Sequence, residues 1–333
     1  MHWKSMDDPA NEQNRNAGNG GDLVKHTVYL ATLDFLLKRE PWSQGMRLRE
    51  CHAGRGIYHV TADHQSRELL SCLHSIETTG ETVLLERAQQ SILSDLVCRP
   101  DVARNVEQHI EWYAGSALIN ARRLADDPGS HTLDLYELKP ETRQILRSVL
   151  MDMHLPTRLS WNVPSDGDET RDFDGEGYIE REIGKWGSRD LILLDPFALW
   201  QSPKNQDRRD RYGRILDALI QRGSDAASLM LFWVWGSRNK HEAVKDLNDE
   251  PRDGIASGYH ELRSRLHGAG LPFVRVKWCW DQWFAMWIAV PGLSAEHLAE
   301  LEQEIGAHCR SVTALWKRCG HKAPELEVKA ERP

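Results

Sequence analysis

The chain has 333 residues, 40% hydrophobic and 28% charged, as in an ordinary globular protein large enough for one catalytic domain with an insertion. Its net charge of -8 argues against a protein that coats nucleic acid without preference, although it allows a local basic face. The six cysteines include no Cys-x-x-Cys pair and no zinc-ligand spacing with histidine, and no apolar run reaches the length of a membrane span. We therefore expect a cytoplasmic protein without a metal site.

The first part of the chain predicts an arm followed by a helix. Residues 1–15 are polar and rich in asparagine, which is typical of a flexible arm. A glycine-rich loop then leads to Asp22, which we expect to cap a helix over residues 23–36. Lys25 and His26 lie in its first turn, either as solvated surface side chains or as part of a site.

The next segment is a short strand, Met46–Glu50, that runs into the glycine-rich turn Cys51–Gly56. Such a turn lets backbone amides approach a ligand closely. His59 stands where the dinucleotide fingerprint requires a third glycine, so we do not expect a nicotinamide or flavin site. A Gly-x-Gly turn suits S-adenosylmethionine, which has no pyrophosphate.

Residues 59–113 read as a helical insertion, because they are too long for an ordinary crossover between parallel strands. Helices are expected over 66–77 and 82–96, and Ser116 is placed to cap a third. A second strand, His131–Glu137, ends on an acidic residue, and such residues bind ribose hydroxyls in folds of this kind.

A third strand is expected over Arg158–Val163. The fourth strand that follows it has the clearest sequence pattern for a buried strand in the chain. Residues 191–194 form a continuous apolar run, which predicts a strand buried on both faces. The strand ends on Asp195, and Pro196 must leave the sheet. A carboxylate is thus expected at the carboxyl edge of the sheet, where open α/β folds bind ligands. The alternative is an ordinary Asp-Pro turn.

A basic run follows this strand and has two interpretations. It is either a solvated helix start with internal ion pairs or a phosphate-binding patch beside Asp195. Its members are Lys204, Arg208, Arg209, Arg211 and Arg214, with Asp207 and Asp210 between them.

The C-terminal third predicts the end of the sheet. A strand over Ser228–Trp235 and a helix near 260–267 precede two strands, Phe273–Trp280 and Phe284–Val290, which look antiparallel. Residues 294–317 look helical, and 318–333 are charged and expected to be a flexible tail. The fold class is therefore α/β, with a mostly parallel seven-stranded sheet, an antiparallel C-terminal strand pair and a single domain over residues 16–317.

Together these segments resemble a known family, the bacterial large-subunit ribosomal RNA adenine-N6 methyltransferases of the J type. The most specific part of the resemblance is the segment of residues 17–27, followed by the segment of residues 52–56. Further matches are 114–119, 137–140, Asp166-Gly167 and Asp195-Pro196, and the whole spans roughly residues 16 to 290. The family implies a Rossmann-like class I methyltransferase fold with a helical insertion, and S-adenosylmethionine as cofactor.

The resemblance also implies roles for individual residues. The residues that line the cofactor site would be Lys25, His26, His52, Gly54, Gly56, Ser116, Glu137 and Asp166. Glu137 would bind the ribose hydroxyls and Asp166 the adenine amine. The catalytic motif would be Asp195, Pro196 and Phe197, with Asp195 acting at the amine being methylated. From their own positions beside Asp195, we expect the following residues to contact the substrate, which we expect to be RNA: Trp200, Lys204, Arg208, Arg209 and Arg211. We also expect the protein to be a monomer.

The chain departs from the family at its catalytic motif. The family carries Asp-Pro-Pro-Tyr, whereas this chain has Asp195-Pro-Phe-Ala198, so Phe197 or Trp200 must stack on the target base. Asp-Pro-Phe followed by a small residue also resembles guanine-N2 tRNA methyltransferases, and Asn16 stands where the family usually has histidine. Three alternatives to adenine-N6 methylation of RNA are open: guanine-N2 methylation, a methyltransferase fold that binds nucleic acid or protein without catalysis, and methylation of a protein or small molecule.

Overall fold

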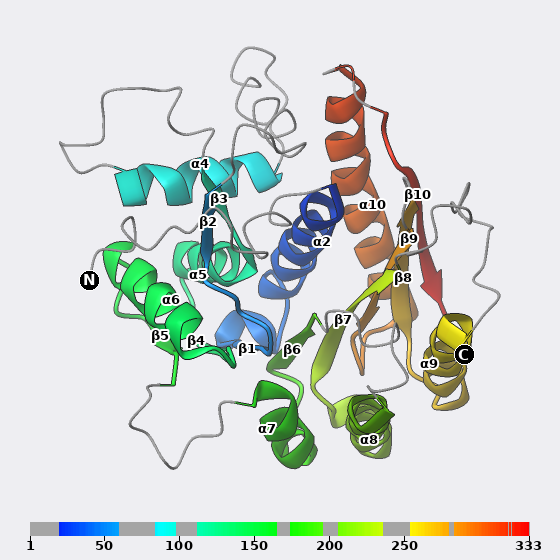
Figure 1. Cartoon of the computed structure of the whole chain (residues 1–333). Coiled ribbons are helices and arrows are strands. Elements are labelled where there is room, and N and C mark those ends of the chain that lie inside the picture. The colour runs from blue at the N-terminus through cyan, green and yellow to red at the C-terminus, as the bar shows by residue number, and fades with distance from the viewer. Residues whose placement is uncertain are drawn as a thin grey trace.

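The centre of the structure, a computed structural model, is an eight-stranded sheet in the order β10-β8-β9-β7-β6-β1-β4-β5 (Figure 1). The structure describes residues 20–59, 84–97, 112–164, 174–195, 206–235, 254–279, 283–318, 320 and 322–332. The strands of the sheet are β1 (Arg47–Glu50), β4 (His131–Leu135), β5 (Leu159–Asn162), β6 (Asp190–Leu194), β7 (Ser228–Trp235), β8 (Phe273–Cys279), β9 (Trp283–Ala289) and β10 (Glu325–Glu331).

The parallel part of the sheet runs from β5 through β4, β1 and β6 to β7. All of β6 is buried, and its side chains alternate between two hydrophobic cores. Leu191 and Leu193 pack in one core, while Ile192 and Leu194 pack in the other. This confirms a strand covered on both faces, as a continuous apolar run predicts.

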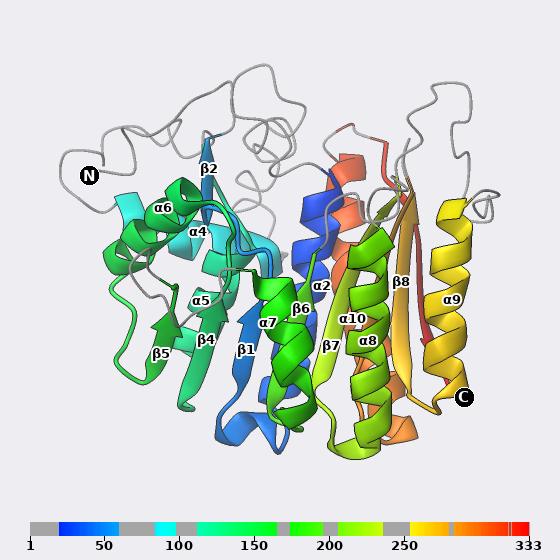
Figure 2. The same cartoon turned by 60° about the horizontal axis from the view of Figure 1, so that its bottom comes forward.

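Helices cover both faces of this sheet. They are α2 (Gly20–Leu37), α4 (Leu84–Val97), α5 (Ser116–Asp126), α6 (Pro140–Asp152), α7 (Gly175–Glu182), α8 (Gln206–Arg222), α9 (Gly254–Gly268) and α10 (Ala295–Arg318). Figure 2 shows α7, α8 and α9 in front of the sheet and α2, α5 and α10 behind it. The expected α/β fold with a mostly parallel sheet is therefore confirmed.

The helix α2 differs from its expected form at its start. It begins at Gly20, so Asp22 lies within its first turn and does not cap it. A negative charge there is favoured by the partial positive charge of the helix N-terminus. Asp22 also forms an ion pair with Lys25, at 2.7 Å between Oδ1 and Nζ.

The insertion is bracketed by a small two-stranded antiparallel sheet that the sequence pattern did not reveal. Its strands are β2 (Ile57–His59) and β3 (Trp112–Ala114). The helix α4 confirms the expected helix over 82–96, and Gln89 fixes it to β3 with two hydrogen bonds of 2.8 Å to the backbone of Ala114. The expected arm over 1–15 and helix over 66–77 lie outside the described residues.

The C-terminal end of the sheet has one strand more than expected. The antiparallel pair β8–β9 is confirmed, with β9 between β7 and β8. The expectation of a flexible tail is wrong for residues 325–331, because they form β10, which pairs with β8 along its whole length. Leu326, Val328 and Ala330 pack against the core on one face of this strand. In the sequence these three apolar residues alternate with charged residues, and for this reason the sequence pattern indicated a charged tail.

Ion pairs on the other face of β10 explain how its charges are accommodated. Glu331 is buried and accepts from Arg263 and His267 of α9, at 2.8 and 2.7 Å. Arg275 of β8 lies 2.9 Å from the second carboxylate oxygen of Glu331.

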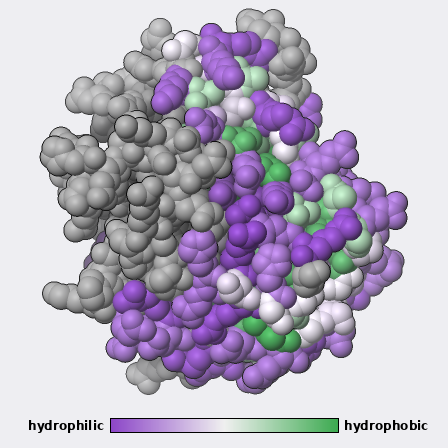
Figure 3. All heavy atoms as spheres, turned by 90° about the vertical axis from the view of Figure 1, so that its right-hand side faces the viewer, coloured by the Kyte–Doolittle hydropathy of each residue, from purple (hydrophilic) through white to green (hydrophobic). Residues whose placement is uncertain are grey.

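On the side of the molecule that carries β10 and α9, the described surface is mostly hydrophilic, with apolar residues in small patches (Figure 3). None of the helices that the structure describes has the length and apolar character needed to cross a membrane.

We predict that Glu331→Gln destabilises the protein by about 3 kcal/mol, because it leaves the buried guanidinium of Arg275 and the partly exposed one of Arg263 without the carboxylate that they share. Urea denaturation at neutral pH measures this change in the free energy of unfolding. Glu325→Gln, at the exposed start of the same strand, is the matched control. Equal stabilities of the two variants would contradict the role of the cluster in holding β10.

Candidate functional site

The carboxyl ends of β1, β4 and β6 lie side by side, because β1 pairs in parallel with both neighbours. Backbone hydrogen bonds continue past the strand ends: Cys51 N donates to Leu193 O at 3.0 Å, and Ala53 N donates to Tyr136 O at 3.0 Å. The segments that follow these strands therefore meet at one edge of the sheet. This is the edge at which the sequence predicted a site.

The glycine-rich turn after β1 is tied to the end of β4. Gly54 and Gly56 have φ of 61° and 80°, the left-handed region that favours glycine. A side chain at Gly54 would also clash with the hydroxyl of Tyr58. Gly54 N donates to Glu137 Oε2 at 3.1 Å, so the turn and the predicted ribose-binding carboxylate form one unit.

Asp195 is joined to Lys25 across a separation of 170 residues. Lys25 Nζ lies 2.7 Å from Asp195 Oδ2 and 2.7 Å from Asp22 Oδ1, and 4.9 Å from the centre of the Phe232 ring. Burial lowers the pKa of Lys25, but Asp195 and Asp22 outweigh it and hold the pKa well above its usual value. Lys25 is therefore an ammonium ion shared by two carboxylates.

His52 connects Asp195 to the helices on the other face of the sheet. Asp195 N donates to His52 Nδ1 at 3.2 Å, and His52 Nε2 lies 3.0 Å from Glu176 Oε1. Burial lowers the pKa of His52, but Cys51 and Glu176 outweigh it and raise that pKa well above its usual value. A charged imidazole has an N–H on both nitrogens and could not accept from Asp195 N, so the contact at Nδ1 requires the neutral form with its proton on Nε2. Burial raises the pKa of Glu176, but hydrogen bonds from His52 and Arg208 outweigh it and hold that pKa well below its usual value.

Glu50, the last residue of β1, is a buried carboxylate that the sequence reasoning missed. It accepts hydrogen bonds from Ser116 Oγ and, at 3.0 Å, from Asn120 Nδ2. Ser116 thus binds Glu50 and does not cap α5, which has Gly115 as its N-cap. Burial raises the pKa of Glu50 from 4.5 to about 7, although the hydrogen bonds from Ser116 and Asn120 lower it.

His26 faces the insertion. Its Nδ1 forms a hydrogen bond with the hydroxyl of Tyr113 on β3, and the two rings are stacked with centroids 5.6 Å apart. Burial lowers the pKa of His26 to about 3, so it is a neutral imidazole at neutral pH. This side chain links α2 to the start of the Gly115–Ser116 segment.

Three arginines of the basic run are engaged in ion pairs with α7 and the residue before it, and one of them is Arg214, which pairs with Glu180. Arg208 binds Glu176 through two nitrogens, with Nε 3.0 Å from Oε2. Arg211 binds Asp174 at 2.7 Å and Glu180 at 3.2 Å. The ion-pair interpretation of the run therefore describes these contacts, and phosphate binding by Arg208 and Arg211 stays a prediction.

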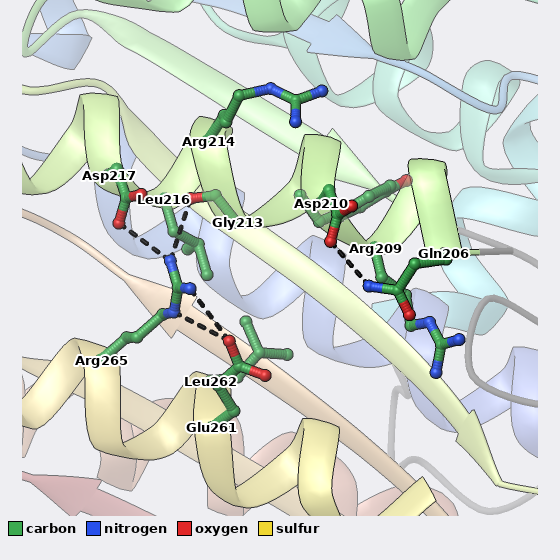
Figure 4. A pocket seen from close by; sticks show the side chains of 11 residues that line it. Gln206, Arg209, Asp210, Gly213, Arg214, Leu216, Asp217, Glu261, Leu262 and Arg265 are labelled. Atoms are coloured by element: carbon green, nitrogen blue, oxygen red, sulfur yellow. Dashed lines mark hydrogen bonds and ion pairs between the residues drawn. The ribbon is translucent and has the colours of Figure 1, made fainter. Parts of the chain in front are cut away.

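Arg209 lies elsewhere, at one end of a cavity of about 440 Å³ between α8 and α9 (Figure 4). Arg265 of α9 crosses this cavity to Asp217 and binds Glu261, both at 2.9 Å. Acidic and basic side chains alternate on its walls, and it is a separate feature from the edge that carries Asp195.

Several predicted site residues lie outside the described residues. They are Asp166, Pro196, Phe197, Trp200 and Lys204. Of the others, the structure gathers Lys25, His52 and Asp195 in one set of contacts, and Gly54 and Glu137 in a second. Glu50 could have been found, because it ends a strand directly before a glycine turn. Glu176 had no such signal, since it follows a polar stretch of sequence with no regular pattern.

Comparison with known proteins supports the fold and not a specific activity. No family model matches this chain, and no curated protein sequence matches it significantly. Among solved structures it is similar to a Legionella pneumophila protein described by the family model DUF519, with 16% identity, a TM-score of 0.59 and coverage of 95% of this chain and 98% of that one. At this identity the similarity shows the fold alone.

A second solved structure, a probable spermidine synthase from Corynebacterium glutamicum, has 11% identity and a TM-score of 0.41 over 96% of this chain and 77% of that one. A score this low supports no conclusion. The Rossmann-like fold of class I methyltransferases agrees with the strand order described above. The more specific resemblance to adenine-N6 methyltransferases of the J type stays a prediction.

We predict that Glu50 makes stability depend on pH. Its folded pKa is raised from 4.5 to about 7, so the folded protein retains a proton that the unfolded chain releases in this interval. Stability from this group is therefore complete below the unfolded pKa and is lost as pH rises, by up to about 1.4 kcal/mol per pH unit. Urea denaturation across the interval should show this slope in the wild type and a flatter one in Glu50→Gln. Parallel curves would contradict the assignment.

Proposed function

We propose that this protein is an S-adenosylmethionine-dependent methyltransferase that modifies an exocyclic amine of a nucleic-acid base, with adenine N6 in RNA as the first candidate. The observation that carries the proposal is Asp195, a carboxylate at the carboxyl end of β6 that Lys25 and His52 hold from two sides. It lies at the sheet edge that also bears the glycine turn and Glu137.

The donors and acceptors at this edge fit the proposed cofactor. The oxygens of Glu137 accept N–H groups from Gly54 and Lys139, at 3.1 and 3.0 Å. A carboxylate offers about four acceptor positions, so Glu137 keeps capacity for ribose hydroxyls. The cofactor, when bound, supplies a methyl group on a sulfonium that needs no further activation. This chain then has to orient it and the amine in line, which can contribute about 7–11 kcal/mol in favourable cases.

Asp195 suits an amine acceptor because the nitrogen lone pair of an exocyclic amine is delocalised into the ring. Lys25 binds Oδ2 of Asp195, and we assign Oδ1 to an N–H of the target amine. The carbonyl of Pro196 would accept the second N–H. Lys25 with its two carboxylates, Asp22 and Asp195, carries a net negative charge, which favours the positive charge that develops on the amine.

A second candidate, guanine-N2 methylation, is favoured by the residues after Asp195. Phe197 and Ala198 replace the proline and tyrosine of the adenine-N6 family, so the stacking surface is altered. Stacking on an aromatic ring offsets part of the cost of extruding the base, by roughly 1–3 kcal/mol. The nucleoside that carries the methyl group after the reaction will therefore identify the target base.

We predict that the purified protein transfers label from S-adenosylmethionine to RNA, and that Asp195→Asn abolishes the transfer while leaving cofactor affinity within about threefold of wild type. Separate incubations with total RNA, DNA and protein, followed by nucleoside separation, measure it. N6-methyladenosine would support the first candidate, and N2-methylguanosine the second. Asp217→Asn, which changes an exposed, ion-paired carboxylate on α8, is the control. A fully active Asp195→Asn would refute the role of Asp195, and cofactor binding without transfer to any of the three would favour a non-catalytic protein.

A further prediction separates RNA binding from folding in the basic run. Replacing Lys204 and Arg209 by methionine should weaken RNA binding and reduce the slope of log affinity against log salt by about 1.4, or about 0.7 per lost contact to single-stranded phosphate. Arg208→Met should instead lower stability, because Glu176 is buried against it. Filter binding at several salt concentrations and urea denaturation measure the two effects. An unchanged salt slope in the double variant would contradict RNA contact by this segment.

A further inference from the structure

The segment that carries Glu137 is anchored by a buried arginine of the following helix. Arg143, the fourth residue of α6, donates from Nη1 to the carbonyls of Glu137 and Leu138, at 2.8 and 2.7 Å. Its backbone N–H also donates to Lys139 O at 3.0 Å. Arg143 is only 3% exposed, so its guanidinium group is committed to the protein interior.

The placement of this cation is unfavourable for the helix itself. A positive charge near a helix N-terminus opposes the helix dipole, and a buried guanidinium requires hydrogen bonds to offset its lost hydration. The presence of arginine is therefore explained by what its hydrogen bonds hold, which is the backbone at Glu137.

Glu137 is thereby fixed at both its side chain and its backbone. The carboxylate accepts from Gly54 N and Lys139 N, while Arg143 binds the carbonyl of the same residue. Hydrophobic packing does not supply this anchor, because Leu138 is 69% exposed. Without the Arg143 side chain, the link between β4 and α6 would keep its connection to the glycine turn and the backbone bond to Lys139 O, but it would lose the two bonds to the carbonyls of Glu137 and Leu138.

We propose that Arg143 is a positioning residue that holds Glu137 for a cofactor ribose. This inference rests on the proposed function, in which Glu137 binds the ribose hydroxyls. Arg143 acts through the backbone and touches no ligand. Its loss therefore affects recognition of the ribose diol more than the rest of the cofactor.

The test compares the affinities for S-adenosylhomocysteine and its 2′,3′-dideoxy analogue by calorimetry. The wild type binds the diol ligand more tightly, and this preference reports the contact to Glu137. Arg143→Met reduces the preference by about tenfold, whereas Arg143→Lys, which keeps the charge with less reach, reduces it by about threefold. Arg158→Met is the matched control, because Arg158 also binds backbone carbonyls, those of Ala125 and Asp127, before the amino end of β4. It leaves the preference unchanged.

The outcomes separate this inference from the function on which it rests. If the wild type binds neither ligand, the proposed function fails. If the wild type prefers the diol but Arg143→Met weakens both ligands by one factor, Arg143 is structural only and the inference is overturned. If the methionine variant does not fold, Arg143→Lys decides: a reduced preference supports the positioning role, and a wild-type preference overturns it.

Discussion

The rest of the site depends on the hydrogen bonds that the buried carboxylate of Glu176 accepts. It receives hydrogen bonds from His52, which follows β1, and from Arg208 and Tyr212 of α8. His52 in turn accepts the backbone N–H of Asp195. Burying this carboxylate without donors would cost several kcal/mol, so its hydrogen bonds couple the turn after β1, the helices α7 and α8 and the end of β6 to one another.

Asp195 is consequently held from both faces of the sheet. His52 and Glu176 connect its backbone to the side of α7 and α8, and Lys25 reaches its carboxylate from α2 on the opposite side (Figure 2). A carboxylate fixed in this way is already oriented before a substrate arrives, which is the condition for electrostatic stabilisation of a developing charge. The same sheet edge brings Glu137 to the glycine turn, so the proposed cofactor and amine positions follow from one strand arrangement.

Sequence reasoning succeeded where the physical signal is local. The apolar run of β6 and the glycine turn after β1 are readable because burial on both faces and positive φ restrict the residues allowed. The strand β10 was missed because its charges are neutralised by Arg263 and Arg275, which lie far away in the sequence. For Arg208, ion pairing and phosphate binding could not be separated, because Glu176 reaches it only through the packing of α7 on α8.

The most direct test of this account is calorimetric titration of the purified protein with S-adenosylmethionine, for the wild type and for Glu137→Gln. The account predicts one bound molecule per chain and an affinity at least about tenfold lower in the variant, because a carboxylate that accepts two hydroxyls becomes an amide that accepts them poorly. An absence of binding, or equal affinities of the two proteins, would contradict the assignment of this sheet edge as a cofactor site.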